Sequence, residues 1–169
     1  MKWFNCLLAS LLVTFAPYPS ASAAEDQPFV ASASARAITH VALADLASQR
    51  AVDDGAKAFA KKWRDDSTRL RDGLDNSANA AGAEVATALT ANRQRMLDDL
   101  AALEGPSFDA RFAQVAATEI DQLLLSFREA SQVGEDARLK SFAEQSLPTL
   151  EQNLAAANAL QARLGAPID

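Results

Sequence analysis

Three observations predict an all-α fold, an antiparallel bundle of four long helices with one extra, shorter helix. Apolar residues recur at steps of three and four in five segments of the chain. β-branched residues are scattered, and no window shows the sustained apolar–polar alternation of a half-buried strand. Four of the segments have about 20 to 28 residues, which gives rods of about 30–40 Å. Long helices of similar length joined by short turns pack as an antiparallel bundle.

Residues 1–23 are interpreted as a cleaved secretory signal peptide. Lys2 gives a short positive start, residues 3–16 form an apolar run without charge, and small residues lead to a predicted cleavage after Ala23. The run is short for a bilayer span and no stop-transfer pattern follows it, so a retained membrane anchor is the less favoured alternative. The mature chain, residues 24–169, then forms one helical-bundle domain. We expect it in the periplasm of a Gram-negative bacterium or outside the cell.

The composition excludes several classes of function. The single cysteine, Cys6, lies in the signal peptide, so the mature chain has no disulfide, no thiolate nucleophile and no zinc–thiolate site. The 22 acidic residues outnumber the 16 Lys and Arg, and the net charge is −6. An acidic protein is a poor ligand for nucleic acid or anionic lipid, so we expect no nucleic-acid partner and no membrane contact beyond the signal peptide. The sequence does not identify any other partner or an oligomeric state.

The first two predicted helices span residues 29–50 and 54–76. The first is rich in alanine, which blurs its apolar stripe. Asp53 or Asp54 is the expected N-cap of the second. Residues 75–82 carry Asn, Ser and Gly and are predicted to form a turn. The expected buried face of the second helix consists of Ala56, Phe59, Ala60, Trp63, Ser67, Leu70 and Leu74.

The third and fourth predicted helices span residues 86–104 and 107–131. Gly105 and Pro106 separate them, as Gly just after a helix and Pro beyond it commonly do. The third is the short one and is expected to cap or cross the bundle. Its residues in phase are Leu89, Arg93, Met96, Leu97, Leu100 and Leu103. The fourth has a broad apolar face of Phe108, Phe112, Val115, Ile120, Leu123, Leu124 and Phe127.

The last predicted helix spans residues 137–164, with Asp136 as its N-cap, and it contains Pro148. Either Ser146 caps a new helix there, or one long helix kinks at the proline. The apolar stripe continues across this point without slipping, which favours one kinked helix. Its members are Phe142, Ala143, Ser146, Leu150, Asn153, Leu154 and Ala157.

The same phasing places two polar residues, Ser67 and Asn153, on the inward sides of their helices. The ordinary explanation is structural, because bundle cores tolerate a few small neutral polar groups when these are hydrogen-bonded. Nothing in the phasing alone requires a chemical site.

Four stretches of the chain resemble a family of exported bacterial proteins. They are FVASASARAITHVALADLA (29–47), AFAKKWRDDST (58–68), PSFDARFAQVAATEID (106–121) and RLKSFAEQSLPTLEQNL (138–154). The chain resembles the family catalogued as domain of unknown function four-one-four-two, whose members are often labelled predicted outer-membrane or periplasmic proteins. The resemblance implies a ferritin-like helical bundle. Its most specific parts are the Phe108-Asp109 pair and the Leu147-Pro148 step.

The resemblance also implies a polar centre. The family pattern has an acid–His pair on the second helix, another on the fourth, a His after the Leu-Pro step and a Glu on the first helix. These positions fall here on Asp66-Ser67, Glu119-Ile120, Asn153 and His40. Both acids are kept and all three expected histidines are replaced. Inward His and carboxylate groups on facing helices are what a bundle uses to hold a metal, so the resemblance implies a degenerate, ligand-depleted metal centre.

Three hypotheses follow. The first is an exported, non-enzymatic helical bundle with an envelope or stress role and no cofactor, since the chain has no phosphate loop, nucleophile elbow or other catalytic set. The second is a ferritin-like metal-binding or redox protein in which His40, Asp66 and Glu119 hold a divalent transition metal weakly. The ordinary interpretation of these three is a core histidine and two ion-paired acids. The third hypothesis is a bundle that opens to bind lipid or a partner helix, which the acidic polar faces disfavour.

Overall fold

The computed structural model describes residues 21–165, and within that range it contains five helices and no strand. The all-α bundle prediction is confirmed. The helices are α1 (Ala21–Arg50), α2 (Asp54–Ala81), α3 (Ala91–Ala101), α4 (Gly105–Val133) and α5 (Ala137–Leu164). Residues 1–20 of the predicted signal peptide lie outside the described residues. The predicted cleavage after Ala23 falls in the first turn of α1 and stays a prediction.

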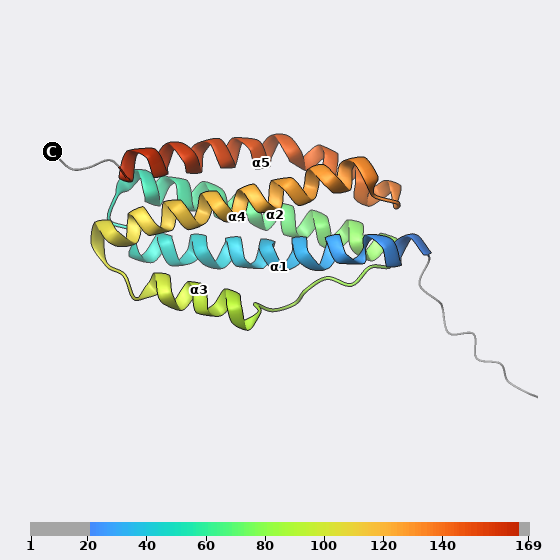
Figure 1. Ribbon diagram of the computed structural model, residues 1–169, viewed down its shortest axis with the longest axis horizontal. Helices are drawn as coiled ribbons and strands as arrows, with labels where there is room; N and C mark the ends of the chain where they lie inside the picture. Colours follow the sequence, from blue (N-terminus) through green and yellow to red (C-terminus); the bar gives the residue numbers. More distant parts are fainter. Residues whose placement is uncertain (1–20, 166–169) are drawn as a thin grey trace, which may run out of the picture.

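The four long helices form two antiparallel hairpins, α1–α2 and α4–α5, and α1 also packs on α4 while α2 packs on α5. Figure 1 shows that α2 and α4 run in the same direction. Their connection, residues 82–104, therefore returns along the length of the bundle, and it contains α3. One long crossover between two hairpins is a connectivity that four-helix bundles use. The ferritin-like label stays a prediction.

Two helices extend beyond their predicted ends. α1 begins at Ala21 rather than at residue 29 and runs through Pro28. α2 continues to Ala81, so the turn predicted for residues 75–82 is wrong. Asn and Ser remain helical there because the buried stripe of α2 continues through Ala78 and Ala81. The helix ends only at Gly82, whose φ of 78° suits glycine.

The third helix is shorter than the predicted 86–104. Thr90 is its N-cap and accepts a hydrogen bond from the backbone of Arg93, so the helix begins at Ala91. Residues 82–90 form an irregular loop beside α1 (Figure 1). The prediction that this helix caps or crosses the bundle is also wrong, because α3 lies along the outer side of α1 and α4.

α5 runs through Pro148 as a single helix, and the prediction of one helix rather than two is confirmed. The predicted kink at Pro148 stays a prediction. The hydroxyl of Ser146 is not an N-cap, since it donates to the carbonyl of Phe142 one turn earlier at 2.8 Å. Such a bond to the preceding turn is a common companion of helix bending. Asp136 is the N-cap of α5, as predicted, and accepts from the backbone N–H groups of Arg138 and Leu139.

A buried aspartate of one hairpin holds the turn of the other. Asp109 of α4 accepts backbone N–H bonds from Val52 and Asp53 in the α1–α2 turn, the shorter at 2.7 Å. Asp26 of α1 accepts from Glu135 and Asp136 in the α4–α5 turn, at 3.1 and 2.7 Å. Both carboxylates are almost wholly buried. These bonds satisfy turn N–H groups that have no helical partner, and they lock the two hairpins together.

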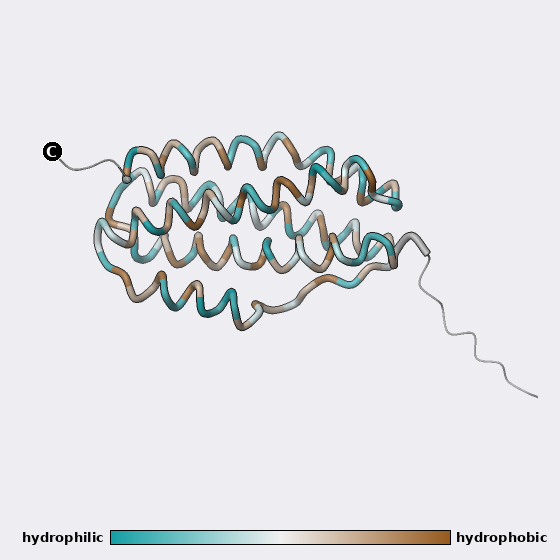
Figure 2. Tube along the Cα trace, in the orientation of Figure 1, coloured by the Kyte–Doolittle hydropathy of each residue, from teal (hydrophilic) through white to brown (hydrophobic). Residues whose placement is uncertain are grey.

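The apolar core has two parts, which occupy opposite halves of the bundle. One contains Trp63 with the rings of Phe59, Phe108 and Phe112. In the other half Phe127 packs edge-on against two further phenylalanine rings. Figure 2 shows hydrophobic and hydrophilic positions alternating along every long helix, as amphipathic bundle helices require.

Candidate functional site: a polar layer in the middle of the bundle

The polar positions predicted from the sequence lie where the two halves of the core meet. On each long helix they fall between residues of one apolar cluster and residues of the other. On α1, for example, His40 separates Ala33 from Leu43, and on α5 Asn153 separates Leu150 from Ala157. We call these positions, together with Ile120 at the edge of one apolar cluster, the middle layer; its members are His40, Asp66, Ser67, Glu119, Ile120 and Asn153. All six are buried.

His40 is 1 % exposed and its ring packs on that of Trp63, with 4.8 Å between the ring centroids. Its Nε2 atom has no hydrogen-bond partner. Burial lowers the pKa of His40 to about 4; the charge and backbone of Glu119 offset part of this effect, and Arg36 and Arg93 add to it. The imidazole is therefore neutral at pH 7.

Glu119 of α4 is held by two arginines from different elements. Arg36 of α1 and Arg93 of α3 donate to the same carboxylate oxygen, Oε2, at 2.8 and 2.7 Å. Arg93 also donates to the hydroxyl of Thr39 on α1 at 3.2 Å. The side chains of both arginines are only 17 % exposed, so water screens these pairs weakly. This cluster joins α1, α3 and α4 at one point.

The two arginines also fix the charge of Glu119. Burial by itself raises the pKa of a carboxyl group, but the hydrogen bond and charge of Arg93 and the charge of Arg36 outweigh it. The pKa of Glu119 is therefore below its ordinary value. The group is a carboxylate at neutral pH, and its charge is already compensated within the protein.

Asp66 belongs to a second ionic cluster, which faces α5 rather than α1. Lys62 donates to Asp66 at 2.6 Å, and Arg69 pairs with the other oxygen of the same carboxylate. Lys62 also donates to the side-chain oxygen of Asn153 at 3.1 Å, which links α2 to α5. The predicted inward position of Asn153 therefore has a structural explanation, a hydrogen bond across the helix pair.

These residues do not fit a metal ion. Across residues 21–165, no group of three or more His, Cys, Asp or Glu side chains is placed to hold one. The structure brings His40 near Glu119 but holds Asp66 in the separate cluster with Lys62, so it does not gather the three into one ligand set. Both carboxylates already bind cationic side chains, and Ile120 offers no donor atom.

Comparison with known proteins identifies the chain at the level of its family. A family model described as Domain of unknown function (DUF4142) matches residues 14–160. The chain belongs to this family. No curated protein and no solved structure matches it. The predicted resemblance is thus confirmed, and the family's description names no reaction.

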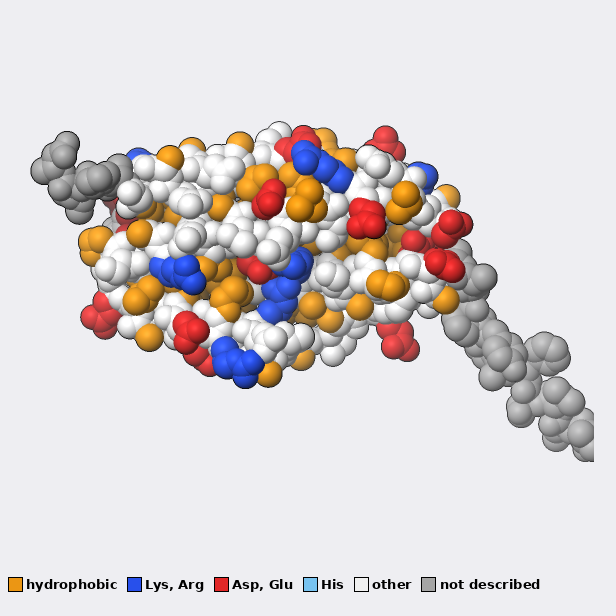
Figure 3. All heavy atoms as spheres, viewed as in Figure 1, with side chains coloured by type: hydrophobic (Ala, Val, Ile, Leu, Met, Phe, Trp, Pro, Cys, Tyr) orange, Lys and Arg blue, Asp and Glu red, His pale blue; other side chains and the backbone are white. Residues whose placement is uncertain are grey.

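None of the helices described between residues 21 and 165 has both the length and the apolar composition needed to cross a membrane. The face seen in Figure 3 carries acidic and basic side chains interspersed with apolar ones rather than a field of one sign.

From the sequence we did not predict the cationic side chains that contact the middle layer, Arg36, Arg93 and Lys62. A signal existed for Arg93, because it falls in phase with the apolar stripe of the third helix, where an arginine needs a buried partner. Arg36 gave no such signal, since the alanine-rich first helix has no sharp stripe. Lys62 lies beside the apolar stripe of α2 and reaches Asp66 from the surface of that helix.

Proposed function

We propose that the protein is an exported, non-catalytic helical bundle with an envelope or stress role, in which ion pairs replace the metal centre implied by the family pattern. The single observation that carries this proposal is the occupation of Glu119 by Arg36 and Arg93. A guanidinium group supplies to the buried carboxylate the positive charge that a metal would otherwise supply. Two such groups also repel an incoming cation. Glu119 then works as a fastener between helices and not as a ligand.

The buried histidine supports the same interpretation. A metal-binding imidazole offers one ring nitrogen to the metal and is oriented through the other. His40 instead packs on the ring of Trp63 with Nε2 unpaired, and no cluster of three or more possible ligands occurs within residues 21–165. Its surroundings are those of a core side chain.

The export part of the proposal rests on the signal-like N-terminus and on the absence of cysteine from residue 24 onward. It is tested by expressing the full chain in a Gram-negative host and measuring the N-terminal residue of the periplasmic product. We expect Ala24. Retention of residues 1–23 in the cytoplasmic or membrane fraction would refute export.

Metal analysis tests the central claim. The mature chain is purified without chelator and its bound Mn, Fe, Co, Ni, Cu and Zn are quantified. We expect far less than one ion per chain and the same melting temperature with and without EDTA, because a ligand that binds only the folded state raises its stability. A stoichiometric transition metal, or a clear fall in melting temperature with EDTA, contradicts the proposal.

A matched variant shows that the assay detects a site when one is present. Ser67→His, Ile120→His and Asn153→His, combined with His40→Glu, restore the family pattern at four buried positions. We expect this variant to bind a divalent transition metal measurably above the wild type. If it binds none, the four positions do not surround one centre, and the comparison with the family pattern fails.

A further inference from the structure

The crossover, residues 82–104, is attached to one side of a bundle whose core is nearly complete without it. Only α1 and α4 contact α3 closely, whereas each long helix packs on two others. The crossover contributes three buried apolar residues, Ala83, Leu97 and Leu100. Four partly buried ones, Val85, Leu89, Met96 and Leu103, pack against the two clusters. The rest of both apolar clusters comes almost entirely from the long helices.

α3 has little stability of its own. It contains 11 residues, and isolated helices shorter than about 12–15 residues are marginal in water. Surface clefts of about 190 Å³, between Met96 and Val115, and about 400 Å³, between Leu97 and Leu46, border its two sides. Only two residues of α3, Leu97 and Leu100, are buried, so this helix buries little apolar surface against the bundle.

Polar contacts supply most of the remaining attachment, and nearly all of them go to α1. Gln27 exchanges two hydrogen bonds with the backbone of Glu84, each 2.8 Å long. Ser34 accepts from the backbone of Ala86, and Arg50 donates to the carbonyls of Ala101 and Leu103. Most of these partners are exposed, so water competes for the bonds and each contributes little net stability.

The contact of Arg93 with Glu119 differs from these. It is charge-assisted, 2.7 Å long and shielded from water, and it is the only ion pair that joins the crossover to the body of the bundle among residues 21–165. Charge-assisted bonds in such surroundings are worth more than neutral ones at the surface. Arg93 is therefore the strongest single attachment of α3.

We propose that the crossover, residues 82–104, is a latched strap: it opens from the bundle as one unit while the four long helices stay folded, and the Arg93–Glu119 ion pair is the latch. Opening uncovers apolar side chains of α1 and α4, among them Leu46 and Val115, around the remaining Arg36–Glu119 pair. Opening of the strap requires neither a metal nor the proposed envelope role, so its test is independent of both.

Hydrogen exchange measured by mass spectrometry on the mature protein tests this directly. In the wild type we expect the amides of residues 91–104 to exchange at least about 10-fold faster, after correction for intrinsic rates, than those in the middle of α4 and α5. Arg93→Met should accelerate exchange in the strap by a further 10- to 100-fold or so, since a hydrogen bond to a charged group is lost. Exchange in α5 should stay unchanged.

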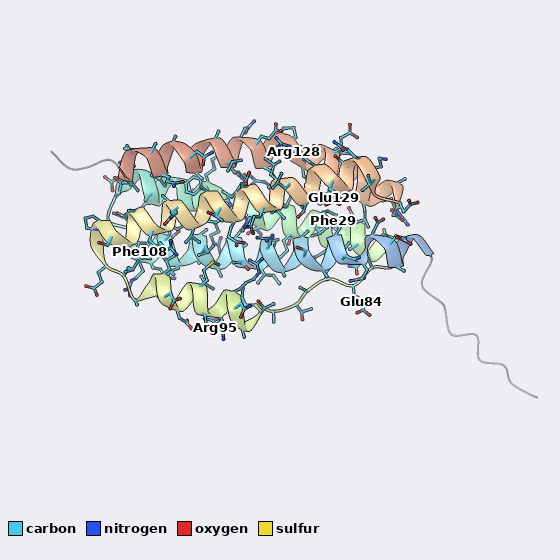
Figure 4. The ribbon with its side chains drawn as sticks, viewed as in Figure 1. Phe29, Glu84, Arg95, Phe108, Arg128 and Glu129 are labelled. Atoms are coloured by element: carbon cyan, nitrogen blue, oxygen red, sulfur yellow. The ribbon has the colours of Figure 1, made fainter. Side chains whose placement is uncertain are left out.

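Arg95→Met is the matched control. Arg95 lies on the same helix, pairs only with Asn92 one turn away, and points away from the bundle (Figure 4). We expect its exchange to match the wild type. Three results overturn the proposal: strap protection equal to that of α5 in the wild type, equal effects of the two variants, or faster exchange throughout the protein in Arg93→Met.

Limited trypsin digestion of the wild type provides a second test that needs no variant. Cleavage requires an unfolded segment, so the first cuts should follow Arg93 or Arg95, and the two hairpin fragments should elute together because α1–α4 and α2–α5 contacts survive. First cleavage within α2, α4 or α5, or separation of the fragments under native conditions, contradicts the latched strap.

Discussion

Acidification should destabilise this protein through His40, the single histidine of the chain. Its pKa is about 4 in the folded state, compared with the ordinary 6.5 that the unfolded chain has. Between these values the unfolded state binds a proton that the folded state excludes. The free energy of unfolding therefore falls as pH falls through this window, and the loss is complete below it. At about 1.4 kcal/mol per pKa unit, about 2 kcal/mol is lost by pH 5 and about 3 kcal/mol in full.

Between pH 6.5 and 5, the expected change in unfolding free energy comes from His40 alone. Glu119 and Asp136 have lowered pKa values in the folded state, so the stability that they contribute is lost only below their unfolded values of 4.5 and 3.8. A change in stability between pH 6.5 and 5 therefore reports the burial of the imidazole, and a steeper loss below pH 4.5 reports the carboxylates.

Urea unfolding of the mature chain at pH 7.5, 6.5, 5.5 and 5.0 measures the effect. Trp63 is the only tryptophan left after removal of the signal peptide, and it touches the His40 ring, so its fluorescence follows the relevant region. His40→Gln cannot take up a proton and should show an unfolding free energy that is flat from pH 6.5 to 5. The reasoning would be refuted if the unfolding free energy changed equally with pH in the two proteins, or if that of the wild type did not change. A histidine NMR titration midpoint near 6.5 in the folded protein would do so too.

Three further substitutions and one control, Asp65→Ala, are compared by urea unfolding at pH 7.5. Glu119→Ala leaves two partly buried arginines without their carboxylate and should cost about 3 kcal/mol; a loss below about 1 kcal/mol would show that water replaces the pair. Asp109→Ala frees the turn N–H groups after α1 and should cost about 2–3 kcal/mol, whereas Asp65→Ala on the exposed side of α2 should stay within about 0.5 kcal/mol. Pro148→Ala restores the missing N–H in α5 at an exposed position and should stabilise by about 1 kcal/mol or more; destabilisation would mean that packing depends on the proline.

The long helices were predictable because each carries a repeated apolar signal. In α4 and α5 the predicted ends lie within about two residues of the observed ones, which is the ordinary spread of helix assignment. The errors occur where short-range signals compete with packing. Asn76 and Ser77 resemble turn residues, yet buried alanines one turn further on keep α2 helical. Leu89 extends the apparent stripe of the third helix, yet residues 82–90 bond to side chains of α1 instead.

The middle layer was predictable in position and not in chemistry. Periodicity places Ser67 and Asn153 inward, and both are buried. What each inward group bonds to depends on long side chains that reach across from other helices, such as Arg93, which lies 26 residues from Glu119 in sequence. Helical phase gives the direction of a side chain from its own axis and says nothing about which neighbour the folded chain brings opposite it. Pairings of this kind therefore appear only in three dimensions.

The most specific parts of the family resemblance turn out to have mechanical roles. Asp109 fastens the α1–α2 turn, and Pro148 lies on the exposed side of one uninterrupted helix. Neither residue needs a metal to perform its role. Buried carboxylates, however, need cationic partners or take up protons. The arginines around Glu119 and the Lys62 contact with Asp66 meet this requirement, and they do so with groups that no chelator can remove.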